Sequence, residues 1–300
     1  MYYFLAILPV LLVLISLIVY IISYYNDIYN FMPKGAECFS RFKGSPISSI
    51  HFKEYLKSVH PFMQKIKCPD MKHNFILDYS KNIRQLPKKY TEMINTYTNI
   101  ANRLTKDLGR FNSFPWSIYM SINNLEMGMP YTLDSSIIIS LTDLESMYST
   151  FKHGHINEHF LNTLIHEKIH VIQRGNQKIF NDFYLKEYPI LNKRYLEKLP
   201  EKILEIRMNN PDSNNQLWTY KINSKIYVPL LMYANNAVHE VAFNVENFND
   251  MLYLKSVKSK LGFSRSTSIY HPNEIFACEV AHHIIDKTLP TKYINFLKKV

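Results

Sequence analysis

Two histidines four positions apart, with a glutamate directly after the first, lie in an apolar segment near the middle of the chain. Residues 161–174 read LNTLIHEKIHVIQR and contain His166, Glu167 and His170. Residues at i and i+4 share one face of an α-helix, so both imidazoles can reach one metal ion, with Glu167 beside them. The apolar flanking residues are typical of a helix buried at the centre of a domain. The pattern predicts a zinc-binding helix over about 156–174.

A zinc site of this kind needs a third protein ligand and leaves its fourth position to water. Glu274, in the segment HPNEIFACEVAHH, is the best candidate. Pro272 suits the first turn of a helix, and this would place Glu274 on a fixed backbone. Glu279, five residues later, is the alternative third ligand, and the residues alone leave both open.

The two motifs together resemble a known family. HEKIHVIQ and HPNEIFA are similar to the HExxHxxQ … (N/H)-P-x-E-x-x-A pattern of zincin-like metallopeptidases, with the downstream glutamate placed as in gluzincins. The resemblance covers about 131–290 and implies an α+β domain with a central HExxH helix and a small mixed sheet. It also implies that His166, His170 and Glu274 bind one Zn²⁺ ion and that Glu167 is the general base. The 103 residues between His170 and Glu274 exceed the spacing of compact gluzincins.

This resemblance predicts hydrolysis of protein or peptide substrates by zinc-activated water. Residues 135–141 (SSIIISL) precede the predicted zinc helix, as the edge strand does in zincins. A substrate could then add to that strand through main-chain hydrogen bonds. The alternative function is a catalytically inactive, zinc-binding, membrane-anchored structural or interaction protein.

An uncharged apolar run opens the chain. The 21 residues from Tyr2 to Ile22 would form a helix of about 31 Å, enough to cross the hydrocarbon core of a bilayer. A cleaved signal peptide is the weaker reading, because no Lys or Arg precedes the run and no small-residue cleavage site follows it. Lys34, Arg41 and Lys43 follow the run closely, so the positive-inside rule predicts a single-pass membrane protein with its catalytic part in the cytosol.

The sequence as a whole predicts three parts of the chain. These are a transmembrane anchor over 1–25, a tether and helical region over 26–112, and a zincin-like catalytic domain over 113–300. Helices are expected near 51–58, after Pro87, at about 142–151, near 272–287 and at 291–299. Strands are expected over 116–122, 135–141, 217–222 and 225–233, with a turn at Asn223-Ser224.

Other features carry less chemistry. His155 and His159 are four apart but lack a glutamate in the HExxH position, so they indicate a polar helix start. A hydrogen bond to an oxyanion could come from any of His239, Tyr220, Tyr233 and Tyr270, and spacing selects none. Lys+Arg 35 against Asp+Glu 25 leaves a charge of +10, but no basic-aromatic stripe supports nucleic-acid binding, and no nucleic-acid partner is expected. Three scattered cysteines are expected to be thiols.

Overall fold

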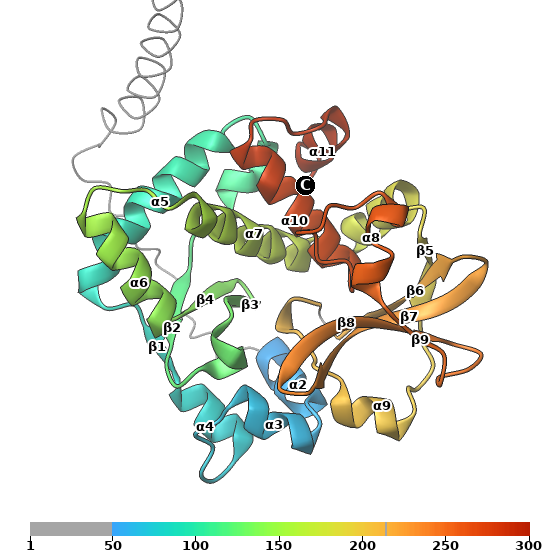
Figure 1. Ribbon diagram of the computed structural model, residues 1–300. Coiled ribbons are helices and arrows are strands. Elements are labelled where there is room, and N and C mark those ends of the chain that lie inside the picture. The colour runs from blue at the N-terminus through green and yellow to red at the C-terminus, as the bar shows by residue number, and fades with distance from the viewer. Residues whose placement is uncertain (1–49, 214) are drawn as a thin grey trace, which may run out of the picture. The chain divides into compact units, whose positions relative to one another are not determined.

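Helix α7 (Glu158–Gly175) lies at the centre of the fold, in agreement with the helix predicted over 156–174 (Figure 1). It belongs to a computed structural model that describes residues 50–213 and 215–300. The Asn157 side chain caps the helix by accepting a hydrogen bond from the Phe160 N–H. Apolar residues bury several faces of α7, and those with at most 1% exposure are Leu164, Ile165, Ile169 and Ile172. The helix is therefore held in place by packing along its length.

The fold is α+β, as predicted. The helices are α2 (Ile50–Ser58), α3 (Pro61–Lys67), α4 (Phe75–Lys81), α5 (Thr91–Leu104), α6 (Leu141–Lys152), α7, α8 (Gln177–Glu187), α9 (Glu201–Ile206), α10 (Pro272–Ile285) and α11 (Thr291–Leu297). The strands are β1 (Ile83–Gln85), β2 (Ile118–Ser121), β3 (Tyr131–Leu133), β4 (Ser136–Ser140), β5 (Leu191–Tyr195), β6 (Leu217–Ile222), β7 (Lys225–Ala234), β8 (Ala237–Asn244) and β9 (Met251–Tyr253). All the helices and strands expected within the described residues are confirmed, whereas α3, α4, α8, α9 and several strands were not anticipated.

The first sheet has the order β1-β2-β4-β3, with β2 and β4 parallel and the other pairs antiparallel. Strand β4, which the sequence suggested as the edge strand, is an inner strand between β2 and β3. That expectation is wrong, and the edge strand next to β4 is β3. A tight hairpin reverses the chain at Asp134, whose φ of 53° lies in the left-handed region.

The first sheet also crosses the boundary expected at residues 112/113. Strand β1 pairs with β2, so a segment from before that boundary completes a sheet formed after it. The described residues all belong to one compact unit of the chain. The described part of 26–112 is therefore packed together with residues 113–300.

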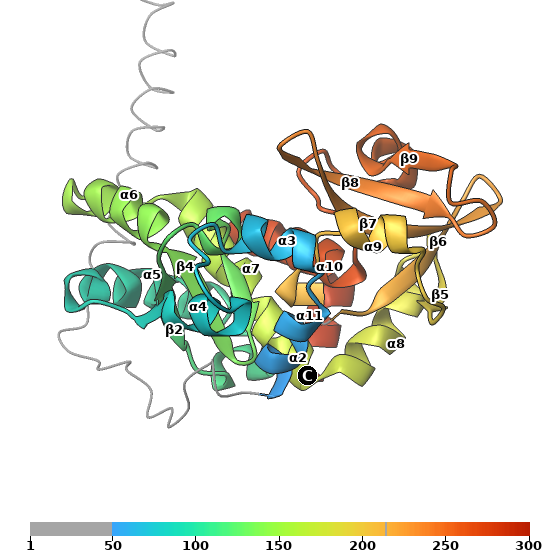
Figure 2. The ribbon, with the colours of Figure 1, turned by 90° about the horizontal axis from the view of Figure 1, so that it is seen from below.

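The second sheet is antiparallel throughout, in the order β5-β6-β7-β8-β9. The predicted turn at Asn223-Ser224 joins β6 to β7, with φ values of 49° and 67° that suit a two-residue hairpin turn. Asn235 and Asn236 make the same kind of connection between β7 and β8. Figures 1 and 2 both show α7 and α10 between the two sheets.

Helix α10 lies against α7 (Figure 1). Its N-cap is His271, whose side chain accepts a hydrogen bond from the Asn273 N–H, and Pro272 occupies the first helical position. Glu274 therefore lies in the first turn of α10, as predicted. The packing of α10 on α7 brings the second motif next to the first.

A buried ion pair joins helix α3 to the segments that contain Glu126 and Asn209. Lys67, on α3, contacts the Glu126 carboxylate and the Asn209 carbonyl, and neither charged side chain is more than 3% exposed. The Tyr55 and Tyr79 hydroxyls donate to Glu126 Oε1 at 2.6 and 2.8 Å. The contact of Lys67 with Asn209 holds the chain immediately before Asn210, whose side chain contacts Glu274.

The predicted anchor at residues 2–22 and the first part of the tether lie outside the described residues. Within residues 50–213 and 215–300, no helix has the length and apolar character needed to cross a bilayer.

Candidate metal centre

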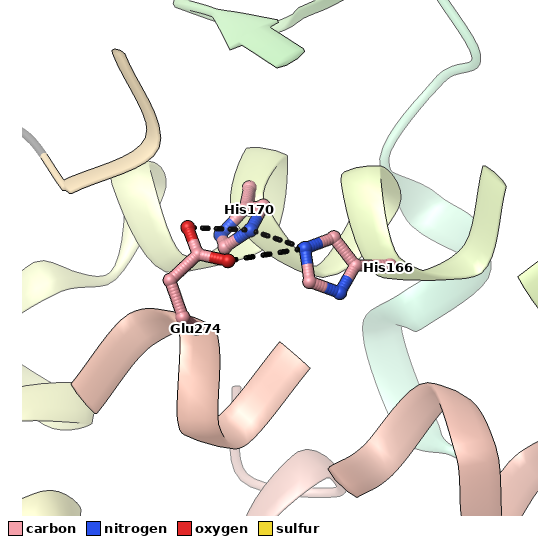
Figure 3. A group of neighbouring side chains, drawn as sticks. All are labelled: His166, His170 and Glu274. Carbon is pink, nitrogen blue, oxygen red and sulfur yellow. Dashed lines mark hydrogen bonds and ion pairs between the residues drawn. The ribbon is translucent and has the colours of Figure 1, made fainter. Parts of the chain in front are cut away.

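His166, His170 and Glu274 come together where α7 and α10 meet (Figure 3). The two Nε2 atoms are 2.9 Å apart. His166 Nε2 lies 3.4 Å from Glu274 Oε2, and His170 Nε2 lies 3.5 Å from Glu274 Oε1. The site is nearly closed, because the side chains of His166, His170 and Glu274 are 17%, 0% and 7% exposed.

These separations fit a metal ion. Zn²⁺ binds histidine nitrogen and carboxylate oxygen at about 2.0–2.2 Å, so ligand atoms on a tetrahedron stand roughly 3.3–3.6 Å apart. The separation of His166 Nε2 from Glu274 Oε2 agrees with that value, and the separation of the two Nε2 atoms is shorter. His170 Nε2 faces the other carboxylate oxygen, Oε1. Two nitrogens and one carboxylate also leave one tetrahedral position open. The donor set therefore fits a zinc ion with an open position.

Hydrogen bonds fix the orientation of His170. Its Nδ1 lies 2.6 Å from Gln173 Oε1, and the Gln173 amide nitrogen donates to the Tyr184 hydroxyl and the Asn273 carbonyl. Because the amide nitrogen is used as a donor, Oε1 accepts from His170 Nδ1–H. A neutral His170 with its proton on Nδ1 offers the Nε2 lone pair to a metal, which is the arrangement usual for histidine ligands. Gln173 belongs to HExxHxxQ and Asn273 to HPNE, but the sequence assigned them no role.

Charges within the cluster perturb one another. Burial by itself would raise the pKa of Glu274, but His170 and His166 hold this pKa well below its usual range. Burial would lower the pKa of His170, yet the facing Glu274 carboxylate leaves it raised. The cluster without metal is thus an ion-paired group, and a metal ion must displace protons to bind.

The predicted general base, Glu167, is buried next to edge strand β3. The Thr132 hydroxyl, on β3, donates to Glu167 Oε2 at 2.8 Å and also lies 3.2 Å from the Glu167 carbonyl. Thr132 has no exposed surface, and Glu167 is 4% exposed. One oxygen of the Glu167 carboxylate is therefore anchored to β3.

The main chain of Thr132 is already bonded on the outer side of β3. Its N–H donates to Asp212 Oδ1 at 2.8 Å, and its carbonyl accepts from Arg174 Nη2 at 2.7 Å. Arg174 also bonds the Pro211 carbonyl and lies 3.5 Å from Asp212 Oδ1. Burial and the charge of Glu167 raise the pKa of Asp212 to about 7. A substrate strand cannot pair with β3 at Thr132 while Asp212 and Arg174 hold the Thr132 main chain in these bonds.

None of the other candidate residues belongs to the group of three, although two of them contact it. The alternative ligand Glu279 accepts a hydrogen bond from the Tyr293 hydroxyl. His155 and His159 are exposed, and His155 precedes the start of α7. His239, Tyr220 and Tyr233 lie in the second sheet, whereas the Tyr270 hydroxyl donates to Glu274 Oε1 at 3.1 Å. Cys68 and Cys278 are free thiols, and Cys278 is close enough to His166 to raise the pKa of that imidazole against the lowering effect of burial.

Sequence reasoning did not find the residues that surround the ligands from other elements. These are Thr132, Tyr184, Asn210 and Asp212. Their distance along the chain from HEKIH and HPNE gives no signal that could have linked them to the site.

Comparisons of the chain with protein-family profiles, with curated proteins and with solved structures each return no match.

Proposed function

We propose that this chain is a zinc-dependent metallopeptidase, anchored in a membrane by residues 2–22, with its zincin-like catalytic part on the cytosolic side. The observation that carries the proposal is the position of Glu167. A carboxylate with one anchored oxygen lies in the helix turn between two histidines that converge with Glu274. A purely structural zinc site has no need of a glutamate at that place.

Three side chains would hold the metal and two more would serve the reaction. His166, His170 and Glu274 would bind one Zn²⁺. Bound Zn²⁺ acts as a Lewis acid that polarises a carbonyl oxygen and lowers the pKa of water to about 7. Glu167 Oε1 takes the proton from the attacking water and passes it to the leaving amine. Thr132 keeps the carboxylate in the orientation in which this transfer occurs.

The substrate class comes from the resemblance of both motifs to zincin-like peptidases. Protein or peptide substrates carry the amide carbonyl that a polarising metal and a general base act on together. Because the Thr132 main chain is occupied, we infer that main-chain pairing at that residue does not hold the substrate in this conformation.

The test combines zinc content with hydrolysis of a mixed peptide library. Wild type is expected to hold one zinc per chain and to cleave peptides, whereas Glu167→Gln is expected to keep its zinc and to lose turnover by a factor of about 10²–10⁴. Glu205→Gln, the same substitution at an exposed position of α9, is the matched control and should behave as wild type. Equal turnover by wild type and Glu167→Gln would refute the mechanism. One zinc per chain with no hydrolysis by wild type would favour the zinc-binding structural or interaction protein.

The membrane assignment has its own test. The full chain should remain in the membrane fraction after an alkaline carbonate wash, and a variant without residues 2–22 should leave it. Release of the full chain by the wash would contradict the anchor.

A further inference from the structure

The side chains of Asn210 and Tyr270 converge on the same oxygen of Glu274. The Tyr270 hydroxyl donates to Glu274 Oε1 at 3.1 Å, and Asn210 Nδ2 lies 3.3 Å from the same atom. Asn210 Nδ2 also contacts the Tyr270 hydroxyl. Oε1 also lies 3.5 Å from His170 Nε2, whereas Oε2 faces His166 Nε2 and contacts neither donor. Oε2 is therefore the oxygen that the two donors leave for a metal ion.

The orientation of the Asn210 amide follows from its other partner. Asn210 Oδ1 accepts a hydrogen bond from the Asp212 N–H at 2.9 Å, which closes a turn over Pro211. With its oxygen used in this way, the amide must present Nδ2 to Glu274. The assignment of oxygen and nitrogen thus rests on two partners that agree.

The turn that carries Asn210 is bonded to each element around the site. Pro211 O accepts from Arg174 on α7, and Asp212 Oδ1 accepts from Thr132 on β3. The Asp212 carbonyl accepts from Asn273 Nδ2 on α10 at 2.9 Å, and Lys67 contacts the Asn209 carbonyl. Asn210 therefore reaches Glu274 from a rigid support rather than from a mobile loop.

Burial adds to the effect of these bonds. Counted over the whole residue, Glu274 and Tyr270 are 5% and 7% exposed, so few solvent molecules can replace a lost donor. Second partners of metal ligands orient those ligands, and their removal typically costs about 10- to 100-fold in metal affinity.

We infer that Asn210 and Tyr270 are positioning residues that hold Glu274 Oε1 and thereby set the affinity of the site for zinc. The inference rests on the proposed zinc site, but it concerns metal affinity and is independent of whether the site hydrolyses peptides. It adds an asparagine 64 positions before the ligand, in a turn that neither sequence motif includes.

The experiment measures zinc affinity of the full chain by competition with a chromophoric chelator, without any substrate. Tyr270→Phe removes one hydroxyl and keeps the ring, and Asn210→Ala removes the amide. Each is expected to weaken zinc binding by about 10- to 100-fold. Asn249→Ala, at an exposed asparagine between β8 and β9, is the matched control and should bind as wild type.

A double-mutant cycle separates positioning from a general structural role. In a Glu274→Ala background, Tyr270→Phe and Asn210→Ala have no ligand to orient, so each should change zinc affinity by less than about twofold. A structural role would cause the same loss in both backgrounds. Should Asn210→Ala fail to fold, Tyr270→Phe alone decides the result.

The outcomes distinguish this inference from the proposed function. If wild type binds zinc and Tyr270→Phe binds it as tightly, the positioning role is overturned while the metallopeptidase proposal stands. If the losses are equal with and without Glu274, the positioning role is also overturned. If wild type binds zinc but cleaves no peptide, the peptidase proposal fails and the affinity cycle still decides the inference. Absence of zinc binding by wild type overturns both.

Discussion

Thr132→Val isolates the hydrogen bond that anchors the general base. The substitution removes the hydroxyl that donates to Glu167 Oε2 at 2.8 Å and replaces it with a methyl group of similar size. The Thr132 main chain, which bonds Asp212 and Arg174, is unchanged. The variant therefore tests the side-chain bond and leaves the zinc ligands and the edge strand in place.

The size of the effect follows from the kind of bond. A hydrogen bond to a charged group contributes about 1.5–3 kcal/mol, and this site is too buried for water to replace the lost donor. If that energy is lost in the transition state, kcat falls by about 10- to 150-fold. Thr132→Ser keeps a hydroxyl at the same position and should recover most of the lost rate.

The assay is steady-state peptide hydrolysis by wild type and both variants at saturating zinc, with zinc content measured by atomic emission on the same samples. All three proteins are expected to hold one zinc per chain, because Thr132 contacts none of His166, His170 and Glu274 in the described hydrogen bonds. Wild-type turnover by a zinc-loaded Thr132→Val would refute the anchoring role. So would an equal loss in Thr132→Ser and Thr132→Val.

Three further predictions concern stability and metal binding. Lys67→Met leaves Glu126 buried without its cation, so it should lower the free energy of unfolding by about 3–5 kcal/mol and the Tm by about 6–20 °C. The double variant Lys67→Met/Glu126→Gln has no unpaired buried charge and should recover part of the lost stability. A double variant as unstable as Lys67→Met would contradict this reasoning. At a free zinc concentration of about 100 Kd, removal of zinc with EDTA should lower the free energy of unfolding by about 2.7 kcal/mol and the Tm by about 5–11 °C. An unchanged Tm would show that the folded chain holds no zinc. Burial raises the pKa of Glu279, so the charged form of this carboxyl is disfavoured in the folded state. Glu279→Gln should therefore keep its zinc and have a free energy of unfolding at pH 7 at least as large as that of wild type. This gain in stability should disappear as the pH falls below about 4.3, where the carboxyl is protonated in both the folded and the unfolded chain. Loss of zinc from Glu279→Gln would return Glu279 to the ligand set.

Local pattern was enough to predict the elements that carry the ligands. The spacing of His166 and His170 follows from helical periodicity, and the apolar residues around them predicted the central position of α7. Pro272 predicted the start of α10 and with it the place of Glu274 in the first turn. The turn at Asn223-Ser224 was likewise predictable from residues that tolerate positive φ.

The edge strand could not be derived from local pattern. Residues 136–140 have the apolar composition of a strand, but composition does not tell an inner strand from an edge strand. Strand β3 is only three residues long and fully buried, so it has no alternation of polar and apolar residues that would reveal it. Its position depends on the hairpin at Asp134 and on the turn that covers it.

By itself, the sequence determined which side chains two helices would present, because a helix fixes the relation between residues three or four positions apart. Only the tertiary structure decided what those side chains meet. Thr132 reaches Glu167 across 35 positions, Asn210 reaches Glu274 across 64, and Gln173 reaches the Asn273 carbonyl across 100. Such contacts arise from the packing of whole elements around a shared core, and no local periodicity encodes the partner of a residue that far along the chain.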